Sequence, residues 1–283
     1  MKNIAIFLNP SKESSGKVST DIVASLKEKG YEVFSCEETP IKDTIVFPSV
    51  NLPENIELIL VLGGDGTFLS IARKYATHKI PMLGVNLGHL GFLTEVEVKD
   101  LKDTILKINE GKYTIENRDM VVAKVYRDGK VIEKTRALNE ITIAKGPLAR
   151  IIQCSTYVDD VFLETYSGDG VIVSTPTGST GYSLSAGGPI IAPNVSSMVI
   201  SPICPHSLHS RSVVVSNNSQ VKIKLNDINQ EVMLTVDGQK SIKLHAYDTV
   251  VIELSDYVIP VVKIQGKNFF DILRLKLNRG TRK

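Results

Sequence analysis

The ten residues Leu58-Ile59-Leu60-Val61-Leu62-Gly63-Gly64-Asp65-Gly66-Thr67 place one carboxylate among three glycines at the end of an apolar run. The run predicts a buried strand, and the glycines after it predict a turn into a helix. Glycine lets a backbone approach a phosphate closely and adopt positive φ, and amides at a helix N-terminus attract anions. The stretch therefore predicts a phosphoryl-transfer site in which Asp65 accepts a proton or helps to hold a metal. The alternative is an ordinary strand-to-helix turn that Asp65 caps.

The segments on either side of this turn alternate between strand-like and helix-like patterns. We predict strands at 4–8, 31–34, 58–62 and 80–85, and helices from 18 to a cap at Gly30, at 68–76 and at 98–109. Such alternation indicates a Rossmann-like α/β domain with a parallel sheet, whose ligands gather past the carboxyl ends of the strands.

From Met120 onward the apolar pattern has a period of two residues. Asp128-Gly129 separates two short runs and is typical of a hairpin turn with positive φ. Strands are also predicted at 141–144, 151–157, 161–166, 171–174, 221–225, 232–236 and 250–254. Many short strands with few helices predict an all-β, sandwich-like second domain. We expect an α/β domain at 1–112, an all-β domain at 113–261, and a C-terminal segment at 262–283 whose helix, 268–277, returns to the first domain.

Composition predicts a globular cytoplasmic protein and disfavours two classes of partner. Of the 283 residues, 42% are hydrophobic and 23% charged, and a net charge of +2 implies no broad basic face for nucleic acid. No apolar run reaches the ~18–20 residues of a membrane span, and no signal core follows Met1. Cys36, Cys154 and Cys204 lie far apart, which predicts buried, reduced thiols rather than disulfides or a zinc site.

Two common nucleotide-binding motifs are absent after the first predicted strand. The segment Asn9-Pro10-Ser11-Lys12-Glu13-Ser14-Ser15-Gly16-Lys17-Val18 lacks the G-x-G-x-x-G pattern. It also departs from a P-loop, because Ser11 replaces the first glycine and Val18 replaces the Ser or Thr that holds magnesium. A hydride-transferring dehydrogenase and a P-loop kinase are therefore disfavoured.

Two later segments contain further candidate groups. The segment 166–189 has six glycines and many hydroxyl groups, which suit ribose and phosphate, and Tyr182 could stack on a ring. Its alternative interpretation is a plain glycine-rich loop between sheets. Asn139 and Glu140 lie at the start of a predicted strand, where a carboxylate could accept two ribose hydroxyls. The alternative there is a solvated strand edge.

Together these pieces resemble the NAD kinase family, which phosphorylates NAD to NADP. The resemblance extends over nearly the whole chain and rests on the turn at 63–67, Asn139-Glu140, the block at 169–189, Ser201–Leu208 and Asp237-Gly238-Gln239. The turn alone is shared with diacylglycerol-type lipid kinases and phosphofructokinases, whereas the block at 169–189 is far more specific. The resemblance implies transfer of the γ-phosphate of ATP to the 2′-hydroxyl of the adenosine ribose of NAD. It also implies a divalent cation, Mg²⁺ above all, supplied with ATP, and a cytoplasmic homo-oligomer, either a dimer or a tetramer.

The same resemblance assigns roles to particular residues. It implies that Asp65 is the general base and that Gly63, Gly64, Gly66 and Thr67 form the turn for the phosphates of ATP. The residues that it implies for NAD binding are Asp65, Gly66, Asn139, Glu140, Arg150, Asp169, Thr180, Gly181, Tyr182, Ser183, Leu184, Ser185 and Gln239. Position 181 is glycine where many members have alanine, which we expect to change little beyond loop freedom.

Two other functions compete with this interpretation. A lipid kinase of the diacylglycerol type would account for Asp65 and a β domain, but not for the block at 169–189. A non-catalytic NAD-sensing module would account for the binding residues but has no use for a base at Asp65. We predict no metal site built from protein ligands alone, because Pro202 and Pro205 disfavour a long helix that would bring His206 and His209 together.

Overall fold

The computed structural model describes residues 2–9, 15–88, 90–147, 150–226, 230–264 and 268–277. It divides the chain into two compact units, Met1–Asn117 with Ile259–Lys283, and Arg118–Val258. These limits lie a few residues from the domain boundaries predicted above. Whether the two units are separate domains stays a prediction. Residues 10–14, which belong to the turn that lacks a P-loop pattern, lie outside the described residues.

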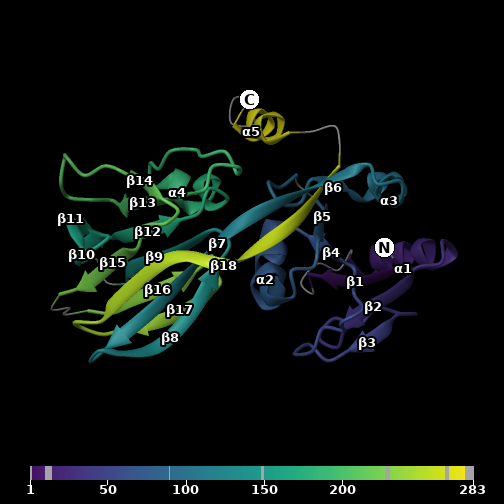
Figure 1. Cartoon of the computed structure of the whole chain (residues 1–283), viewed down its shortest axis with the longest axis horizontal. Coiled ribbons are helices and arrows are strands. Elements are labelled where there is room, and N and C mark those ends of the chain that lie inside the picture. Colours follow the sequence, from purple (N-terminus) through teal and green to yellow (C-terminus); the bar gives the residue numbers. More distant parts are fainter. Residues whose placement is uncertain are drawn as a thin grey trace. The chain divides into compact units, whose positions relative to one another are not determined.

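The first unit is a parallel sheet with helices on both faces (Figure 1). Its elements are β1 (Asn3–Leu8), α1 (Ser15–Glu28), β2 (Glu32–Cys36), β3 (Ile45–Phe47), β4 (Leu58–Gly63), α2 (Asp65–Tyr75), η1 (Ala76–His78), β5 (Met82–Asn86), β6 (Val96–Glu97), η2 (Val98–Asp100), α3 (Leu101–Asn109) and α5 (Phe269–Leu277). The strands β3, β2, β1, β4 and β5 are neighbours in that order, and every pair is parallel. This confirms the predicted α/β class.

Side chains on the two faces of this sheet bury against different helices. Ile4 and Ile6 of β1 belong to one apolar cluster with residues of α1 and α3. Phe7 points the other way, where its ring lies 5.1 Å from that of Tyr75 at the end of α2. A strand covered on both faces reads as a continuous apolar run, which is why the run at β4 is so clear in the sequence.

The C-terminal helix α5 packs against the loop that follows β5, as the sequence predicted for a returning helix. The rings of Phe92 and Phe269 are 6.0 Å apart. The ammonium group of Lys276 lies 4.7 Å from the centre of the Phe92 ring, a cation–π contact. Contacts with Phe269 and Lys276 of α5 therefore hold the Phe92 ring in place.

The second unit consists of antiparallel strands. Its elements are β7 (Tyr113–Arg127), β8 (Lys130–Ala137), β9 (Glu140–Lys145), β10 (Ile152–Val158), β11 (Val161–Gly168), β12 (Gly170–Ser174), η3 (Gly178–Thr180), α4 (Tyr182–Ser185), β13 (Ser197–Ile203), β14 (Val213–Ser216), β15 (Val221–Leu225), β16 (Val232–Val236), β17 (Lys240–Leu244) and β18 (Thr249–Ile264). The chain passes between the units within β7 and again within β18.

These strands form two layers with one apolar core. One sheet has the order β14-β13-β12-β9-β16-β17, and β11-β10-β15-β18 forms a second antiparallel run, with β7 and β8 as a hairpin. Alternate residues of both layers share one buried cluster, such as Ile141 and Ile143 of β9 with Ile223 of β15. Asp128 and Gly129 both have positive φ, as the predicted hairpin turn requires. The predicted sandwich-like class is confirmed.

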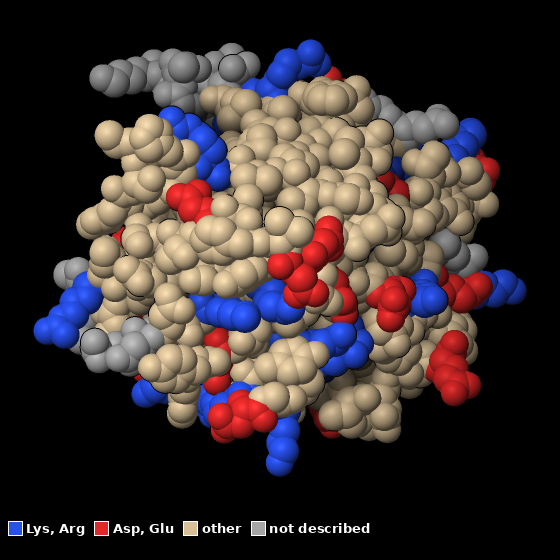
Figure 2. Space-filling view, turned by 60° about the vertical axis from the view of Figure 1, so that its left-hand side comes forward, with Lys and Arg blue, Asp and Glu red and all other residues tan. Residues whose placement is uncertain are grey.

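Some elements were not predicted, and one expectation about the cysteines was wrong. The pattern missed β3, β6, β13, β14 and β17, which are short or, in β13, buried at every position without alternation. Cys36 and Cys154 are buried, but Cys204 is exposed, because it follows β13 in a turn at φ 44°. Acidic and basic side chains lie intermixed on the face shown in Figure 2. Within the described residues, no helix is long and apolar enough to cross a membrane.

Candidate functional site

Asp65 is the first residue of α2 rather than part of a loop before it. The predicted helix began at Phe68, but the structure begins it three residues earlier, directly after Gly64 in extended conformation. A carboxylate in the first turn of a helix interacts favourably with the unpaired amides and the positive end of the helix dipole. The predicted site residue and the helix start therefore coincide.

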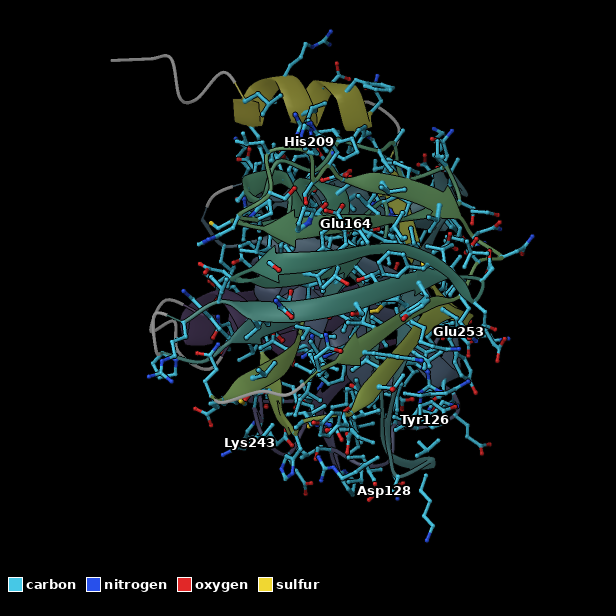
Figure 3. The ribbon with its side chains drawn as sticks, turned by 90° about the vertical axis from the view of Figure 1, so that its left-hand side faces the viewer. Tyr126, Asp128, Glu164, His209, Lys243 and Glu253 are labelled. Atoms are coloured by element: carbon cyan, nitrogen blue, oxygen red, sulfur yellow. The ribbon has the colours of Figure 1, made fainter. Side chains whose placement is uncertain are left out.

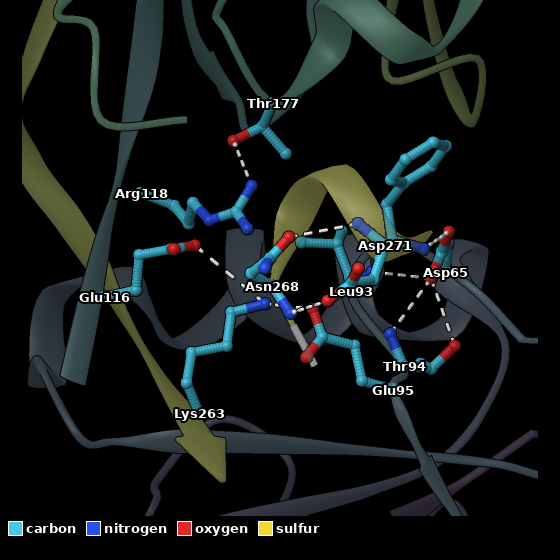
Figure 4. Close-up of polar contacts among 11 residues, drawn as sticks. Asp65, Leu93, Thr94, Glu95, Glu116, Arg118, Thr177, Lys263, Asn268 and Asp271 are labelled. Atoms are coloured by element: carbon cyan, nitrogen blue, oxygen red, sulfur yellow. Dashed lines mark hydrogen bonds and ion pairs between the residues drawn. The ribbon is translucent and has the colours of Figure 1, made fainter. Parts of the chain in front are cut away.

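The Asp65 carboxylate accepts hydrogen bonds from a segment almost thirty residues further along the chain. Its Oδ1 accepts from the amides of Leu93 and Thr94 at 3.0 and 3.1 Å and from the Thr94 hydroxyl at 3.1 Å (Figure 4). Among the described residues, its Oδ2 accepts a hydrogen bond only from the Phe92 amide, at 2.9 Å. A carboxylate oxygen has about two acceptor sites, so Oδ2 keeps capacity for one more donor.

Gly91 makes this close approach possible. A Cβ at Gly91 would lie 1.9 Å from Asp65 Oδ1 and 2.4 Å from the Thr94 hydroxyl oxygen. No side chain fits there, so residue 91 must be glycine for the loop to reach the carboxylate. We call residues 91–94 the Asp65 loop. Sequence reasoning did not predict that this loop would contact Asp65. The only signal was the glycine itself, just past a strand end.

The glycines of the 63–67 turn act differently from what the sequence suggested. We expected positive φ, but neither Gly63 nor Gly64 adopts it. A Cβ at Gly63 would lie 2.5 Å from the Thr67 hydroxyl oxygen, so Gly63 is needed for close packing inside the turn. A Cβ at Gly64 would meet nothing within 4 Å, so close packing does not require glycine there.

The second unit contains a separate cluster around Asn139 and Glu140. The carboxylate of Asp237 accepts from the amides of Leu138, Asn139 and Glu140 at 3.2, 2.7 and 3.2 Å. The Asp237 amide in turn donates to the Glu140 carbonyl at 3.0 Å. Asp237 and Gly238 both have positive φ in the turn between β16 and β17, which aims the carboxylate back at β9.

Glu140 is a buried carboxyl group beside a second one. Only 5% of the residue is exposed, and its Oε2 has no hydrogen-bond partner among the described residues. Burial, and then the charge of Asp237, raise the pKa of Glu140 to about 7, although the Tyr182 amide donates to it and opposes the rise. An unpartnered buried carboxyl oxygen is costly unless a ligand donates to it, so the solvated strand edge considered above is excluded.

Many hydroxyl groups of the block at 169–189 bond within the block or to neighbouring strands. The hydroxyl of Thr175 donates to the Leu138 carbonyl at 2.6 Å, and that of Ser179 donates to the Pro176 carbonyl at 2.6 Å. Ser183 is fully buried and shares a hydrogen bond of 3.0 Å with Ser201. These groups stabilise the loop, so a direct side-chain role for Ser183 in binding NAD is not favoured by its surroundings.

Glycines in this block also allow close packing. A Cβ at Gly178 would lie 2.2 Å from the Asn139 carbonyl oxygen, so this loop packs directly on the Asn139 backbone. A Cβ at Gly181 would lie 3.2 Å from Glu140 Oε2 and 3.4 Å from Asn139 Nδ2. The predicted binding residues Asn139, Glu140 and Gly181 are therefore brought together.

The remaining predicted binding residues lie in varied surroundings. Tyr182 is 46% exposed and available for stacking, whereas the Thr180 hydroxyl donates to the Thr177 carbonyl. Asp169 forms an ion pair of 2.7 Å with Lys145. Arg150 and Gln239 are exposed, and the Arg150 carbonyl accepts from Gln230. Leu184 is partly buried, and Ser185 is exposed. The roles of all these residues stay predictions.

Among the described residues, no group of three or more His, Cys, Asp or Glu side chains is arranged to hold a metal ion. His206 and His209 are exposed in the loop after β13.

The chain thus combines an α/β unit, in which a carboxylate lies at the start of a helix, with a β-sandwich unit. Residues 4–113 match the family model of the ATP-NAD kinase N-terminal domain, and residues 138–264 match that of the ATP-NAD kinase C-terminal domain. The chain belongs to the NAD kinase family.

Relatives and solved structures agree with this membership. An NAD kinase of Natranaerobius thermophilus is 41% identical over 285 residues, with 99% of both chains covered. One from Thermoanaerobacter sp. is 40% identical over 280 residues, covering 98% of this chain and 99% of the relative. The crystal structure of yeast NADH kinase with NADH superposes with a TM-score of 0.86 at 26% sequence identity, and the match covers 97% of this chain and 86% of the yeast chain. The crystal structure of an NAD kinase from Archaeoglobus fulgidus with ATP superposes with a TM-score of 0.73 at 26% identity, and the match covers 98% of this chain and 99% of the other.

Proposed function

We infer that this chain phosphorylates NAD to NADP with ATP as donor and that Asp65 accepts the proton of the attacking 2′-hydroxyl. The activity follows from family membership, whereas the role of Asp65 is a proposal. It is supported above all by the unequal hydrogen bonding of the two carboxylate oxygens. Oδ1 is saturated by three donors, while Oδ2 has one and can accept from a ribose hydroxyl.

In the proposed reaction the oxygen of the 2′-hydroxyl attacks the γ-phosphorus while its proton passes to Asp65 Oδ2. A new oxygen–phosphorus bond forms, the bond between the γ-phosphorus and the β,γ-bridging oxygen breaks, and ADP leaves. The protein's part is chiefly positioning and charge stabilisation. The amides of the turn at 63–67 lie at a helix N-terminus, a position suited to phosphate oxygens.

ATP enters this reaction together with a divalent cation, which we propose to be Mg²⁺. Mg²⁺ characteristically binds one or two carboxylates together with substrate phosphates, and it neutralises phosphate charge. The metal is thus part of the substrate.

Asn139 and Glu140 are proposed to bind the dinucleotide. The unpartnered Oε2 of Glu140 suits a ribose hydroxyl, and the exposed ring of Tyr182 suits stacking on a base or on the nicotinamide. Asp169, Arg150, Thr180, Gly181, Leu184, Ser185 and Gln239 complete the proposed set, whereas the buried hydroxyl of Ser183 stabilises the loop through its bond to Ser201. We also propose a cytoplasmic homo-oligomer, as the family resemblance implies.

The test is a coupled assay for NADP with the full chain, NAD, Mg²⁺ and either ATP or polyphosphate. We expect NADP with ATP and no phosphorylation of diacylglycerol in a parallel incubation. Tight NAD binding without NADP would instead establish the NAD-sensing alternative. Phosphorylated diacylglycerol without NADP would establish the lipid kinase.

A further inference from the structure

We propose that Asp237 is a positioning residue for NAD: it clamps the Asn139-Glu140 backbone and places a second negative charge beside the Glu140 carboxyl group. The proposal rests on the proposed binding of NAD by Asn139 and Glu140. Asp237 itself was not among the predicted site residues, and it is 7% exposed.

The clamp acts on the backbone of three consecutive residues. Asp237 accepts from the amides of Leu138, Asn139 and Glu140, and its own amide donates to the Glu140 carbonyl. From the other side, the Thr175 hydroxyl and amide donate to the carbonyls of Leu138 and Asn139 at 2.6 and 2.8 Å. All three N–H and all three C=O groups of residues 138–140 are thus hydrogen-bonded. The side chains of Asn139 and Glu140 therefore extend from a backbone that hydrogen bonds fix on both sides.

Charge is the second effect of Asp237. Among the described residues, the titratable groups that face Glu140 are Asp237 from the β16–β17 turn and Tyr182 from α4, whose amide donates to Glu140. Burial and the Asp237 charge hold the pKa of Glu140 at about 7. Ribose hydroxyls donate to a carboxylate, so NAD binding is expected to tighten as the pH rises through this range. Neutralising residue 237 lowers the pKa of Glu140 and moves this transition to lower pH.

The chain contains a matched turn that lacks the clamp. Asp128-Gly129, between β7 and β8, has φ values of 50° and 74°, close to 48° and 63° at Asp237-Gly238. Asp128 is exposed and lies at the free end of its hairpin (Figure 3). The two turns share sequence and backbone conformation and differ in what the carboxylate contacts.

The experiment measures NAD affinity by calorimetry from pH 6 to pH 9 for the wild-type chain and the variants Asp237→Asn, Asp237→Glu and Asp128→Asn. We expect wild-type binding to tighten with pH. Asp237→Asn should weaken binding about tenfold at high pH, because a charged acceptor for three amides is lost, and should shift the transition to lower pH. Asp237→Glu keeps the charge but misplaces it, so it should weaken binding without that shift. Asp128→Asn should match the wild type in both respects.

Several outcomes overturn the proposal. If the wild-type chain binds NAD equally well at every pH, the proposed effect of charge is wrong. This measurement needs no variant, so it holds even if Asp237→Asn does not fold. If Asp237→Asn binds NAD more weakly but its affinity changes over the same pH range as in the wild type, Asp237 has a purely structural role. Failure of the proposed function is separate, because it shows as absent NADP formation by the wild-type chain, whatever the Asp237 variants do.

Discussion

Asp65 in the first unit and Asp237 in the second are held by the same arrangement of backbone amides, although we propose different roles for them. Each carboxylate accepts three backbone amides from consecutive residues far away in the sequence. Asp237 is buried, whereas Asp65 is partly exposed and adds the Thr94 hydroxyl as a fourth donor. Amides fix a carboxylate whether it is to react itself or to hold the backbone of a neighbour. The comparison predicts that changes at Asp65 affect turnover, whereas changes around Asp237 affect binding and its dependence on pH.

The largest effect is expected from Asp65→Asn. If Asp65 is the base, turnover falls ~10²–10⁴-fold while NAD affinity is nearly kept. Steady-state NADP formation and calorimetry measure the two quantities. The matched control is Asp103→Asn, because Asp103 is an exposed acid in the first turn of α3. Near-normal turnover by a folded Asp65→Asn protein would remove Asp65 from the mechanism.

Gly91→Ala should disturb the same carboxylate from the opposite side. The new Cβ would fall 1.9 Å from Asp65 Oδ1, so either the Asp65 loop or the carboxylate must shift. We expect a loss of ~1–3 kcal/mol in the free energy of unfolding and a lower kcat. Urea titration and steady-state rates provide the readouts. Gly16→Ala is the control, since a Cβ at this exposed position in α1 meets nothing within 4 Å. Equal stability and rate in both variants would contradict the packing argument.

Glu140→Gln should stabilise the empty protein in a manner that depends on pH. The folded state raises the pKa of Glu140 from 4.5 to about 7. Its stabilising contribution is therefore complete below pH 4.5 and is lost as the pH rises through 7, since the buried group must then ionise. The variant should gain about 3 kcal/mol at pH 8 and less than about 1 kcal/mol at pH 5. Thermal melts at both values test this, with the exposed Glu28→Gln as control. A gain that is equal at pH 5 and pH 8 would show that the buried charge is not the cause.

The smallest effect is expected from Thr94→Val, which keeps the shape of the buried side chain but removes one of four donors to Asp65. We expect kcat to fall about fivefold, equivalent to ~1 kcal/mol, because the three amides still hold the carboxylate. Thr104→Val, at a buried position of α3, is the control for the change of side chain. If Thr94→Val costs as much as Asp65→Asn, the hydroxyl and not the amide loop positions the base.

The sequence predicted the groups with distinctive chemistry but not what holds them. Asp65 is recognisable because a carboxylate among three glycines just past a strand is unusual, whereas Glu140 was assigned a definite role only through the family resemblance. The groups that hydrogen-bond to these carboxylates were missed for a physical reason. Every residue except proline has an amide donor, so nothing in the sequence of residues 92–94 indicates that their amides bind Asp65. The glycines of the 63–67 turn were noticed, but for positive φ rather than for the packing of Gly63 against Thr67.

Local pattern alone determined the class of the two units, the start of β4 and its turn, and the Asp128 hairpin, because these depend on burial periodicity and on the conformational freedom of neighbouring residues. Tertiary structure was needed to join Asp65 to the loop after β5, and Asp237 to a strand about a hundred residues earlier. Two Asp-Gly turns that look alike in the sequence differ for the same reason. Folding buries one carboxylate against three amides and leaves the other in water.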